Sequence, residues 1–416
     1  MPVPRKVGVL TPADERNRVR DLARRVAEIA ASPENEIIKQ RWRDVNALRR
    51  PDRAPVWCCP VGCWPELLPE ESLSCSDPYL RGFEREFRRT LIKCEIGDDS
   101  PVESFWPVGA SFDVVPPNVW GLDAKHVNPD CPGGAWAFDP PLKTEQDLDR
   151  LRLPVYTYNE PRTQEHLSRA HDLIGDILPV KLTCGASINA TLATQATELR
   201  GLGEIMMDMA AQPQLVHRLM AHLRDGALST LDQMEATGLL TFNGTGPMFT
   251  SDPIGPEPAN GRLTCANLWG HANNQEFDLI SPAMWKEFSL DYQMPVLKRF
   301  GLVSYGCCDD LTHKIDGVIT IPNLRMFISS AWTDLDKVIE KCGSRYTIMW
   351  RQKASEVVFT EDSDIDRIDR HLNNGMRRLK GCYYQVVLRE LQTLAGHMDR
   401  LHVWTRMGIE AAERWA

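Results

Sequence analysis

Two adjacent thiols and two adjacent carboxylates follow a short apolar run at residues 301–310, Gly-Leu-Val-Ser-Tyr-Gly-Cys-Cys-Asp-Asp. The run predicts a buried strand, and the edge of a sheet where such strands end is where many α/β enzymes keep their chemistry. Cys307, Cys308 and Asp309 offer soft and hard donor atoms within one turn, a mixture that zinc accepts. The segment therefore predicts a metal site. The alternative is a pair of core cysteines beside an aspartate that caps a helix or turn.

Composition and charge exclude several classes of protein. The formal net charge is −9 and no basic block is present, which argues against nucleic-acid binding. No apolar run of about 18 residues or more occurs, so no membrane span is expected. The first residues lack the apolar core of a signal peptide, and we expect a cytoplasmic protein. Its 12 cysteines are expected to be mostly reduced, a thiol content that suits an anaerobic cell.

Two regions precede the main pattern of the chain. Residues 1–53 predict a helical extension, because apolar residues recur at helical spacing between Val19 and Ile29. Residues from about 60 to 160 read as a long irregular region rich in Pro, Gly and Trp, and loops of this length usually line or cover a pocket. We therefore divide the chain into the extension and one domain, residues 54–416, into which the long loop region is inserted.

Short apolar runs alternate with helical patterns over the rest of the chain. The alternation predicts an α/β fold with parallel strands and crossover helices. With the run RAPVWCCPVG at 53–62, about seven strands are visible, and one more within the irregular region would complete a (β/α)8 barrel. A doubly wound open sheet is the alternative, although no Gly-rich phosphate fingerprint follows any strand. The other predicted strands are 178–186, 239–246, 301–308, 324–330, 346–353 and 383–390, and the predicted helices are 196–212, 213–237, 281–299, 333–342, 362–379 and 396–413.

Several segments, in this order, resemble a known family. They are RPDRAPVW, AFDPPLKTEQDLDRLRLP, SPAMWKEFSLDYQMPVLKRFG, the thiol-bearing strand end and LQTLAGHMDRLHVWTR. Across residues 35–416 the chain resembles the uroporphyrinogen decarboxylase superfamily and, within it, the zinc-dependent methyltransferases that work with corrinoid proteins. The resemblance implies a distorted (β/α)8 barrel of the TIM type, in agreement with the alternation.

Departures from the family patterns narrow the expected chemistry. The decarboxylases grip substrate carboxylates with two arginines after the first strand. The corresponding stretch here, VWCCPVGCWPE, has neither, so porphyrinogen decarboxylation is not expected. The methyltransferases carry His-x-Cys-Gly at a mid-barrel strand end, where Cys307 falls on the Cys, Tyr305 on the His and Cys308 on the Gly. A further zinc-binding Cys of the family corresponds to a position near Glu390.

The resemblance implies a zinc ion with three protein ligands and an open fourth position. The alternatives are a packing role for Cys308, a cap for Asp309, and a salt bridge of Glu390 with Arg351 or Arg389. The predicted metal ligands are Cys307, Cys308, Asp309 and Glu390.

The Tyr-Gly-Cys-Cys-Asp-Asp variant resembles the branch that removes methyl groups from methoxylated aromatic compounds in anaerobes. It implies a methyltransferase that passes the methyl group of an aryl methyl ether to a corrinoid protein, with zinc polarising the ether oxygen. No corrinoid-binding segment is evident, so the corrinoid is expected on a partner protein. Asp310 and His313 are the predicted catalytic residues, which would orient ligands or move a proton to the leaving phenolate. An exposed or capping position is the alternative for His313.

The remaining pocket is predicted from strand ends and from the loop around residues 269–277. Other functions stay open, namely a metal-free decarboxylase-type lyase on the same barrel and a non-catalytic protein that binds an aromatic or corrinoid ligand. An amine or thiol as methyl donor and assembly into a homo-oligomer also stay open. The predicted substrate-binding residues are Asn243, His271, Gln275, Glu276 and Tyr305.

Overall fold

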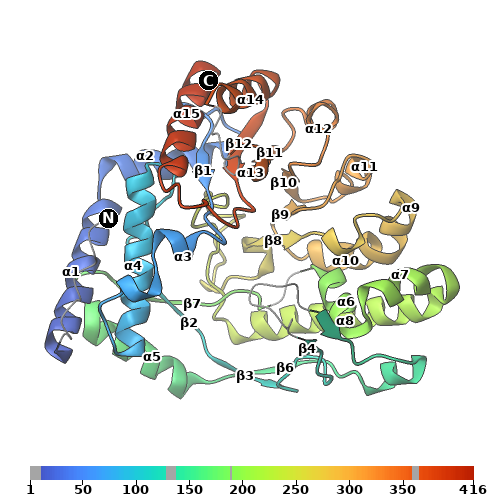
Figure 1. Cartoon of the computed structure of the whole chain (residues 1–416). Coiled ribbons are helices and arrows are strands. Elements are labelled where there is room, and N and C mark those ends of the chain that lie inside the picture. The colour runs from blue at the N-terminus through green and yellow to red at the C-terminus, as the bar shows by residue number, and fades with distance from the viewer. Residues whose placement is uncertain (1–10, 128–136, 188–189, 358–364) are drawn as a thin grey trace.

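A six-stranded parallel sheet forms the centre of the fold, in a computed structural model that describes residues 11–127, 137–187, 190–357 and 365–416. The strand order is β1-β12-β11-β10-β9-β8, so the first strand of the chain lies beside the last (Figure 1). The carboxyl ends of all six strands therefore meet at one edge. The strands are β1 (Val56–Cys58), β8 (Trp269–Ala272), β9 (Leu302–Tyr305), β10 (Leu324–Ser329), β11 (Thr347–Gln352) and β12 (Tyr383–Leu388).

Helices that join the strands cover one face of this sheet, the outer face (Figure 1). Tyr305, Ile348 and Val386 point from three strands into the core shared with these helices. Within the described ranges, no helix combines the length and the apolar character needed to cross a membrane. The helices of this half are α6 (Leu192–Arg200), α7 (Leu202–Ala211), α8 (Pro213–Thr237), α9 (Pro282–Trp285), a π-helical turn (Lys286–Leu290), α10 (Asp291–Leu297), α11 (Ile315–Val318), α12 (Leu335–Cys342), α13 (Ala354–Val357), α14 (Ile365–Arg378) and α15 (Arg400–Arg414).

The opposite face, the inner face, packs on part of the predicted N-terminal extension. Met349 and Val387, which alternate with outward-facing neighbours, meet Trp42 and Val45 in a second apolar cluster. The Thr347 hydroxyl donates to the Val45 carbonyl at 2.8 Å. Residues 1–10 of the predicted extension lie outside the described residues. The extension forms two helices, α1 (Pro12–Ala30) and α2 (Pro33–Asn46), of which α2 carries the contacts to the sheet.

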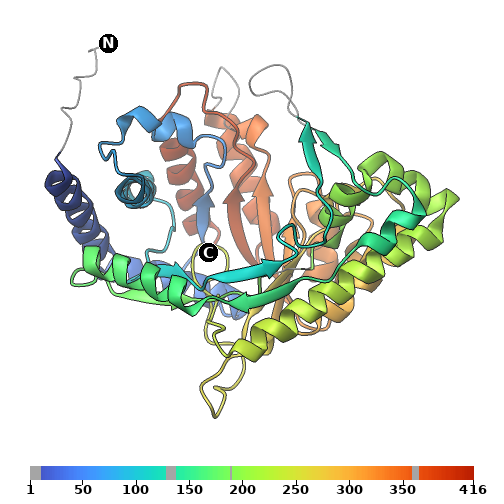
Figure 2. The ribbon, with the colours of Figure 1, turned by 90° about the horizontal axis from the view of Figure 1, so that it is seen from below.

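The region predicted to be irregular, 60–160, contains a 19-residue helix, α4 (Pro78–Ile96), so that prediction was wrong in part. Asp77 caps its first turn, and Phe83 and Phe87 pack with α1 and α5 at one side of the molecule, away from the central sheet (Figure 2). The other elements of this half are short, apart from the 15-residue helix α5. They are α3 (Trp64–Leu67), α5 (Glu160–Ile174), β2 (Trp106–Gly109), β3 (Phe112–Val115), β4 (Lys125–Val127), β5 (Ala137–Asp139), β6 (Val155–Tyr158), β7 (Val180–Thr183) and 3-10 turns at Glu70–Ser72, Glu145–Arg150, Cys265–Asn267 and Gln275–Phe277.

The α/β class with parallel strands is confirmed, but a closed barrel is not shown by the described residues. β7 pairs with β2 in a separate sheet, and strand pairing joins neither of them to β1 or β8. The segment 239–246 was predicted as a strand and is not one. It still bridges the two sheets, because the Thr241 N–H donates to the Cys184 carbonyl at 2.9 Å and the Asn243 amide donates to the Trp269 carbonyl at 2.9 Å.

Candidate functional site

Cys307 and Cys308 leave the carboxyl end of β9 in a tight turn that requires glycine. Gly306 has a φ of +113°, and a Cβ there would lie 2.7 Å from the carbonyl oxygen of Ile328 in β10. The Gly306 N–H donates to the carbonyl of Ala272 in β8 at 2.9 Å. Both neighbouring strands thus fix the turn, which leaves the two sulfur atoms 3.7 Å apart.

The side chain of Asp309 stabilises this turn by accepting hydrogen bonds from backbone N–H groups. Its carboxylate accepts the Cys307 N–H at 2.7 Å and the Asn274 N–H at 3.3 Å, and the residue is 1% exposed. Burial raises the pKa of Asp309, and these two N–H groups oppose the rise. The geometry corresponds to the capping role that the sequence left open for Asp309.

Glu390, at the end of β12, reaches the thiols from the far side of β10 and β11. Its Oε1 lies 3.6 Å from the Cys308 sulfur and 2.9 Å from the Arg351 guanidinium. The salt bridge with Arg351 that the sequence left open is therefore present. Arg351 is buried and also donates to the Cys307 carbonyl at 2.8 Å. Glu390 has a φ of +61°, uncommon for a residue with a Cβ, and this backbone turn directs the side chain toward Cys308.

The thiols and Glu390 fit a zinc ion in donor type and in two separations. Around a tetrahedral zinc, two sulfur ligands lie about 3.8 Å apart, and a sulfur and an oxygen about 3.6 Å apart. The structure has 3.7 Å between Cys307 and Cys308 and 3.6 Å between Cys308 and Glu390. In the part of the chain that is described, no three His, Cys, Asp or Glu side chains already form a complete metal-binding group. Completion of the set requires the Glu390 carboxylate, which is 40% exposed, to turn away from Arg351.

The two thiols differ in acidity because one stabilises the other. A hydrogen bond from Cys308 lowers the pKa of Cys307 to about 6, and the charges of Arg351 and Arg389 help while burial opposes. The same hydrogen bond, burial and the carboxylate of Glu390 raise the pKa of Cys308. Without a metal, the cluster therefore holds one thiolate, on Cys307, at neutral pH.

Alkylation of chelator-treated protein should reveal this difference. Iodoacetamide reacts with the thiolate, so the rate at Cys307 should rise through a midpoint near pH 6 and be level by about pH 7. Cys382, whose pKa is raised by burial, should react appreciably only at higher pH. Peptide mass spectrometry between about pH 5 and pH 9 gives both rates. A Cys307 midpoint at the ordinary thiol value of about 8.5 would contradict this charge arrangement.

His271 lies on the inner face of β8, although the sequence predicted it in a loop. Its Nδ1 is 2.9 Å from the hydroxyl of Ser304 in β9. Burial and, to a smaller extent, the charges of Arg351 and Arg389 lower the pKa of His271 to about 4. The imidazole is therefore neutral at pH 7 and faces the same end of the sheet as the thiols.

Three other predicted substrate-binding residues are engaged elsewhere or exposed. The Asn243 amide is used in both directions, because its oxygen accepts the Trp269 N–H at 2.9 Å while its nitrogen donates to the Trp269 carbonyl. Glu276 accepts the Thr194 hydroxyl at 2.6 Å, and Gln275 is exposed on the turn after β8. Within the described residues, none of the three contacts the thiols, and their substrate contacts stay predictions.

Of the two predicted catalytic residues, Asp310 caps its own loop and His313 lies on the surface. Asp310 accepts the Thr312 N–H at 2.9 Å, which makes it the cap of a short turn. His313 is exposed and lines a surface hollow with Lys337 and Glu340 of α12. The structure thus gives His313 the exposed position that the sequence left open, and a role in proton transfer stays a prediction for both residues.

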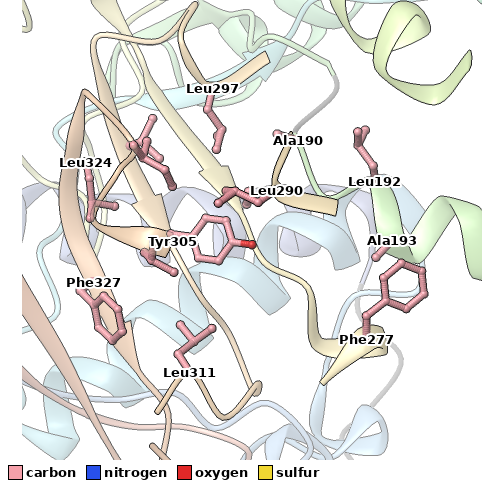
Figure 3. Packing of buried hydrophobic residues seen from close by; sticks show 14 of the residues in the cluster. Ala190, Leu192, Ala193, Phe277, Leu290, Leu297, Tyr305, Leu311, Leu324 and Phe327 are labelled. Atoms are coloured by element: carbon pink, nitrogen blue, oxygen red, sulfur yellow. The ribbon is translucent and has the colours of Figure 1, made fainter. Parts of the chain in front are cut away.

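Tyr305 faces the outer side of the sheet, within the apolar core (Figure 3). It is fully buried, its hydroxyl donates to Gln293 at 2.9 Å, and its ring meets Trp285 edge-on with centroids 6.1 Å apart. Because successive side chains of a strand face opposite sides, Tyr305 points away from the inner face that carries Ser304. Its position is that of a packing residue.

Sequence reasoning gave the two arginines of this site only as partners of Glu390. Arg351 follows Met349 by two positions and Arg389 follows Val387 by two, and both apolar residues belong to the inner face. The period of two along β11 and β12 therefore ends in a cation on each strand. The sequence signal that could have predicted both arginines is this alternation, in which inward-facing apolar residues are followed by an arginine at the carboxyl end of each strand.

Comparisons with known proteins give distant likenesses to solved structures but no match in sequence. No protein-family model matches the chain, and no curated protein matches it. A solved structure, a methyltransferase from Methanosarcina mazei, is similar with a TM-score of 0.49 at 12% sequence identity, covering 91% of this chain and 98% of that one. We therefore base the function on the residues of this chain.

Proposed function

We propose that this protein is a zinc-dependent methyltransferase that takes the methyl group of a methoxylated aromatic compound and passes it to a corrinoid carried by a partner protein. The observation that supports this function is the thiol pair, 3.7 Å apart at a strand end, with Glu390 3.6 Å from Cys308. The proposed zinc ligands are Cys307, Cys308 and Glu390, while Asp309 holds the turn.

The residues around the thiols have separate roles in this proposal. A zinc ion bound there would supply a Lewis acid that draws electrons from the ether oxygen and makes the methyl carbon easier to attack. Arg351 fixes the Cys307 backbone by donating to its carbonyl oxygen. His271 is neutral and donates or accepts a hydrogen bond, so it is suited to stabilise the leaving oxygen without carrying charge.

The rim of the site suits a protein partner. Loops that follow four different strands of the sheet carry exposed apolar side chains, of which Leu279, after β8, is 90% exposed. Apolar side chains on a rim around a polar centre are typical of surfaces that bind other proteins. This arrangement supports docking of a corrinoid carrier at the carboxyl ends of the strands. The exposed apolar residues are Val61, Leu279, Trp332 and Met398.

Metal content and methyl transfer test the proposal directly. Protein purified without chelator is expected to contain about one zinc per chain. With 4-methoxybenzoate as methyl donor and reduced cobalamin as acceptor, methylcobalamin should form and be measured by its absorbance. Removal of zinc with a chelator should stop the transfer, and zinc added back should restore it. Protein that contains no metal, or that transfers at the same rate without it, would contradict the proposal.

A metal-free lyase that removes carbon dioxide from an aromatic acid is the second candidate. Two observations favour it, the engagement of the Glu390 carboxylate by Arg351 and the second arginine, Arg389, beside the site. Release of carbon dioxide from 4-methoxybenzoate by chelator-treated protein would support this reading and replace the first. The methyl-transfer proposal expects no such release.

A further inference from the structure

Arg389 continues the inner face of β12 one residue beyond the end of the strand. Gln385 and Val387, two positions apart, point inward, since Gln385 donates to Asn46 at 2.8 Å and Val387 lies in the inner apolar cluster. Backbone pairing persists past the strand, because the Cys59 N–H donates to the Leu388 carbonyl at 2.8 Å. The alternation therefore places the Arg389 side chain on the inner face.

The charge of Arg389 reaches groups on three sides of the site. Burial raises the pKa of Cys59, after β1, and Arg389 opposes the rise. Burial lowers the pKa of His271 in β8, and the charges of Arg351 and Arg389 add to it. A hydrogen bond from the neighbouring thiol lowers the pKa of Cys307, again assisted by Arg389. Together with its position on the inner face, these effects place Arg389 near the groups that follow β1, β8 and β9.

In the part of the chain that the structure describes, Arg389 has no hydrogen-bond or ion-pair partner. The carboxylate next to it in sequence, Glu390, is taken by Arg351 at 2.9 Å. Arg389 is also half-buried, so it has given up part of its hydration without gaining a charged partner. A guanidinium in this state suits a site that an anionic ligand completes, because two parallel N–H groups match the two oxygens of a carboxylate.

We propose that Arg389 binds the carboxylate of an aromatic acid, which makes the substrate a methoxylated benzoic acid. The methoxy group of this substrate is inferred from the proposed function, whereas its carboxylate is inferred from Arg389. The charges agree with this substrate, because Glu390 pairs with Arg351 and leaves the positive charge of Arg389 without a partner among the described residues. A carboxylate neutralises that charge, and a neutral ether does not.

Titration calorimetry with an acid and its neutral counterpart tests the inference. The probes are 4-methoxybenzoate and 4-methoxybenzyl alcohol, measured on zinc-loaded and on chelator-treated protein. Arg389→Met should weaken binding of the acid about 10- to 100-fold, as expected for loss of a charge-assisted hydrogen bond, and change binding of the alcohol less than about 3-fold. Arg345→Met, an exposed arginine that precedes β11 at the opposite end of the sheet, should leave both affinities unchanged.

Several outcomes would overturn the inference. These are equal affinity of wild type and Arg389→Met for the acid, no binding of the acid to wild type, and sulfate bound as tightly as the acid. If Arg389→Met does not fold, two other measurements test the inference. Wild type should bind the acid more tightly than the alcohol, and Arg389→Lys should bind the acid more weakly than wild type. Failure of the proposed function appears separately, as absent zinc and absent methyl transfer, because binding of the acid through Arg389 requires neither.

Discussion

Replacement of Cys307 with serine is expected to lower bound zinc from about one per chain to background and to slow methyl transfer about 1,000-fold or more. Cys307 is the thiol whose pKa is lowered to about 6, so it is ready to bind a metal ion as thiolate at neutral pH. A serine hydroxyl stays protonated at that pH and binds zinc poorly. Metal analysis and methylcobalamin absorbance measure the two effects on the same preparation.

Cys382→Ser is the matched control for Cys307→Ser. Cys382 is a half-buried free thiol just before β12, at the opposite end of the sheet, where it lines a hollow with Arg50 and Trp415. The control should retain zinc and full transfer. If Cys307→Ser also retains both while remaining folded by circular dichroism, the two adjacent thiols are packing residues, and the proposed metal site does not exist.

The carboxyl-terminal half of the fold was predictable because its elements are long and regular in pattern. The predicted helix 213–237 is α8 residue for residue, and β9 to β12 lie within the four runs predicted as strands between residues 301 and 390. Strands covered on both faces are continuous apolar runs, and helices covered on one face repeat at their own period. Residues 362–364 of a predicted helix lie outside the described residues, and α14 is described from Ile365.

The elements of the other half were harder to predict from the sequence, because they depend on contacts with residues far away in the chain. α4 carries a clear start signal, Asp77 before Pro78, among many other prolines that do not begin helices. β8 has four residues, Trp-Gly-His-Ala, without an apolar run, and exists through pairing with β9. The segment 239–246 has the apolar run without the strand, because the side chain of Asn243 takes the place of backbone pairing with Trp269.

The sequence predicted the part of the candidate site that lies within a few neighbouring residues. It did not predict the contacts between residues far apart in the chain. The vicinal thiols follow from ten residues of sequence, and Glu390 does reach Cys308 across 82 positions. The sequence could not decide whether the Glu390 carboxylate faces a metal or Arg351, since both lie at the same strand ends. Strand alternation alone would have turned Tyr305 outward and Arg389 inward, and it is the most informative rule for this site.

Replacement of Gly306 with alanine is expected to lower the free energy of unfolding by about 2 to 4 kcal/mol. The φ of +113° excludes most residues with a Cβ, and the new methyl group would lie 2.7 Å from the Ile328 carbonyl oxygen and 3.0 Å from Leu311. Relief of this contact must shift the turn, so the separation of the Cys307 and Cys308 sulfurs changes with it. Zinc affinity should therefore fall by at least about 10-fold in the fraction that remains folded.

Gly82→Ala separates the effect of this turn from a general effect of adding a methyl group. Gly82 lies within α4 with open space around its Cα, so alanine there should raise stability by about 0.5 to 1 kcal/mol and leave zinc binding unchanged. Urea denaturation and zinc titration measure both variants. Equal stability and equal zinc affinity in Gly306→Ala and wild type would show that the thiol turn tolerates a shift, and that its geometry does not set the position of the sulfur atoms.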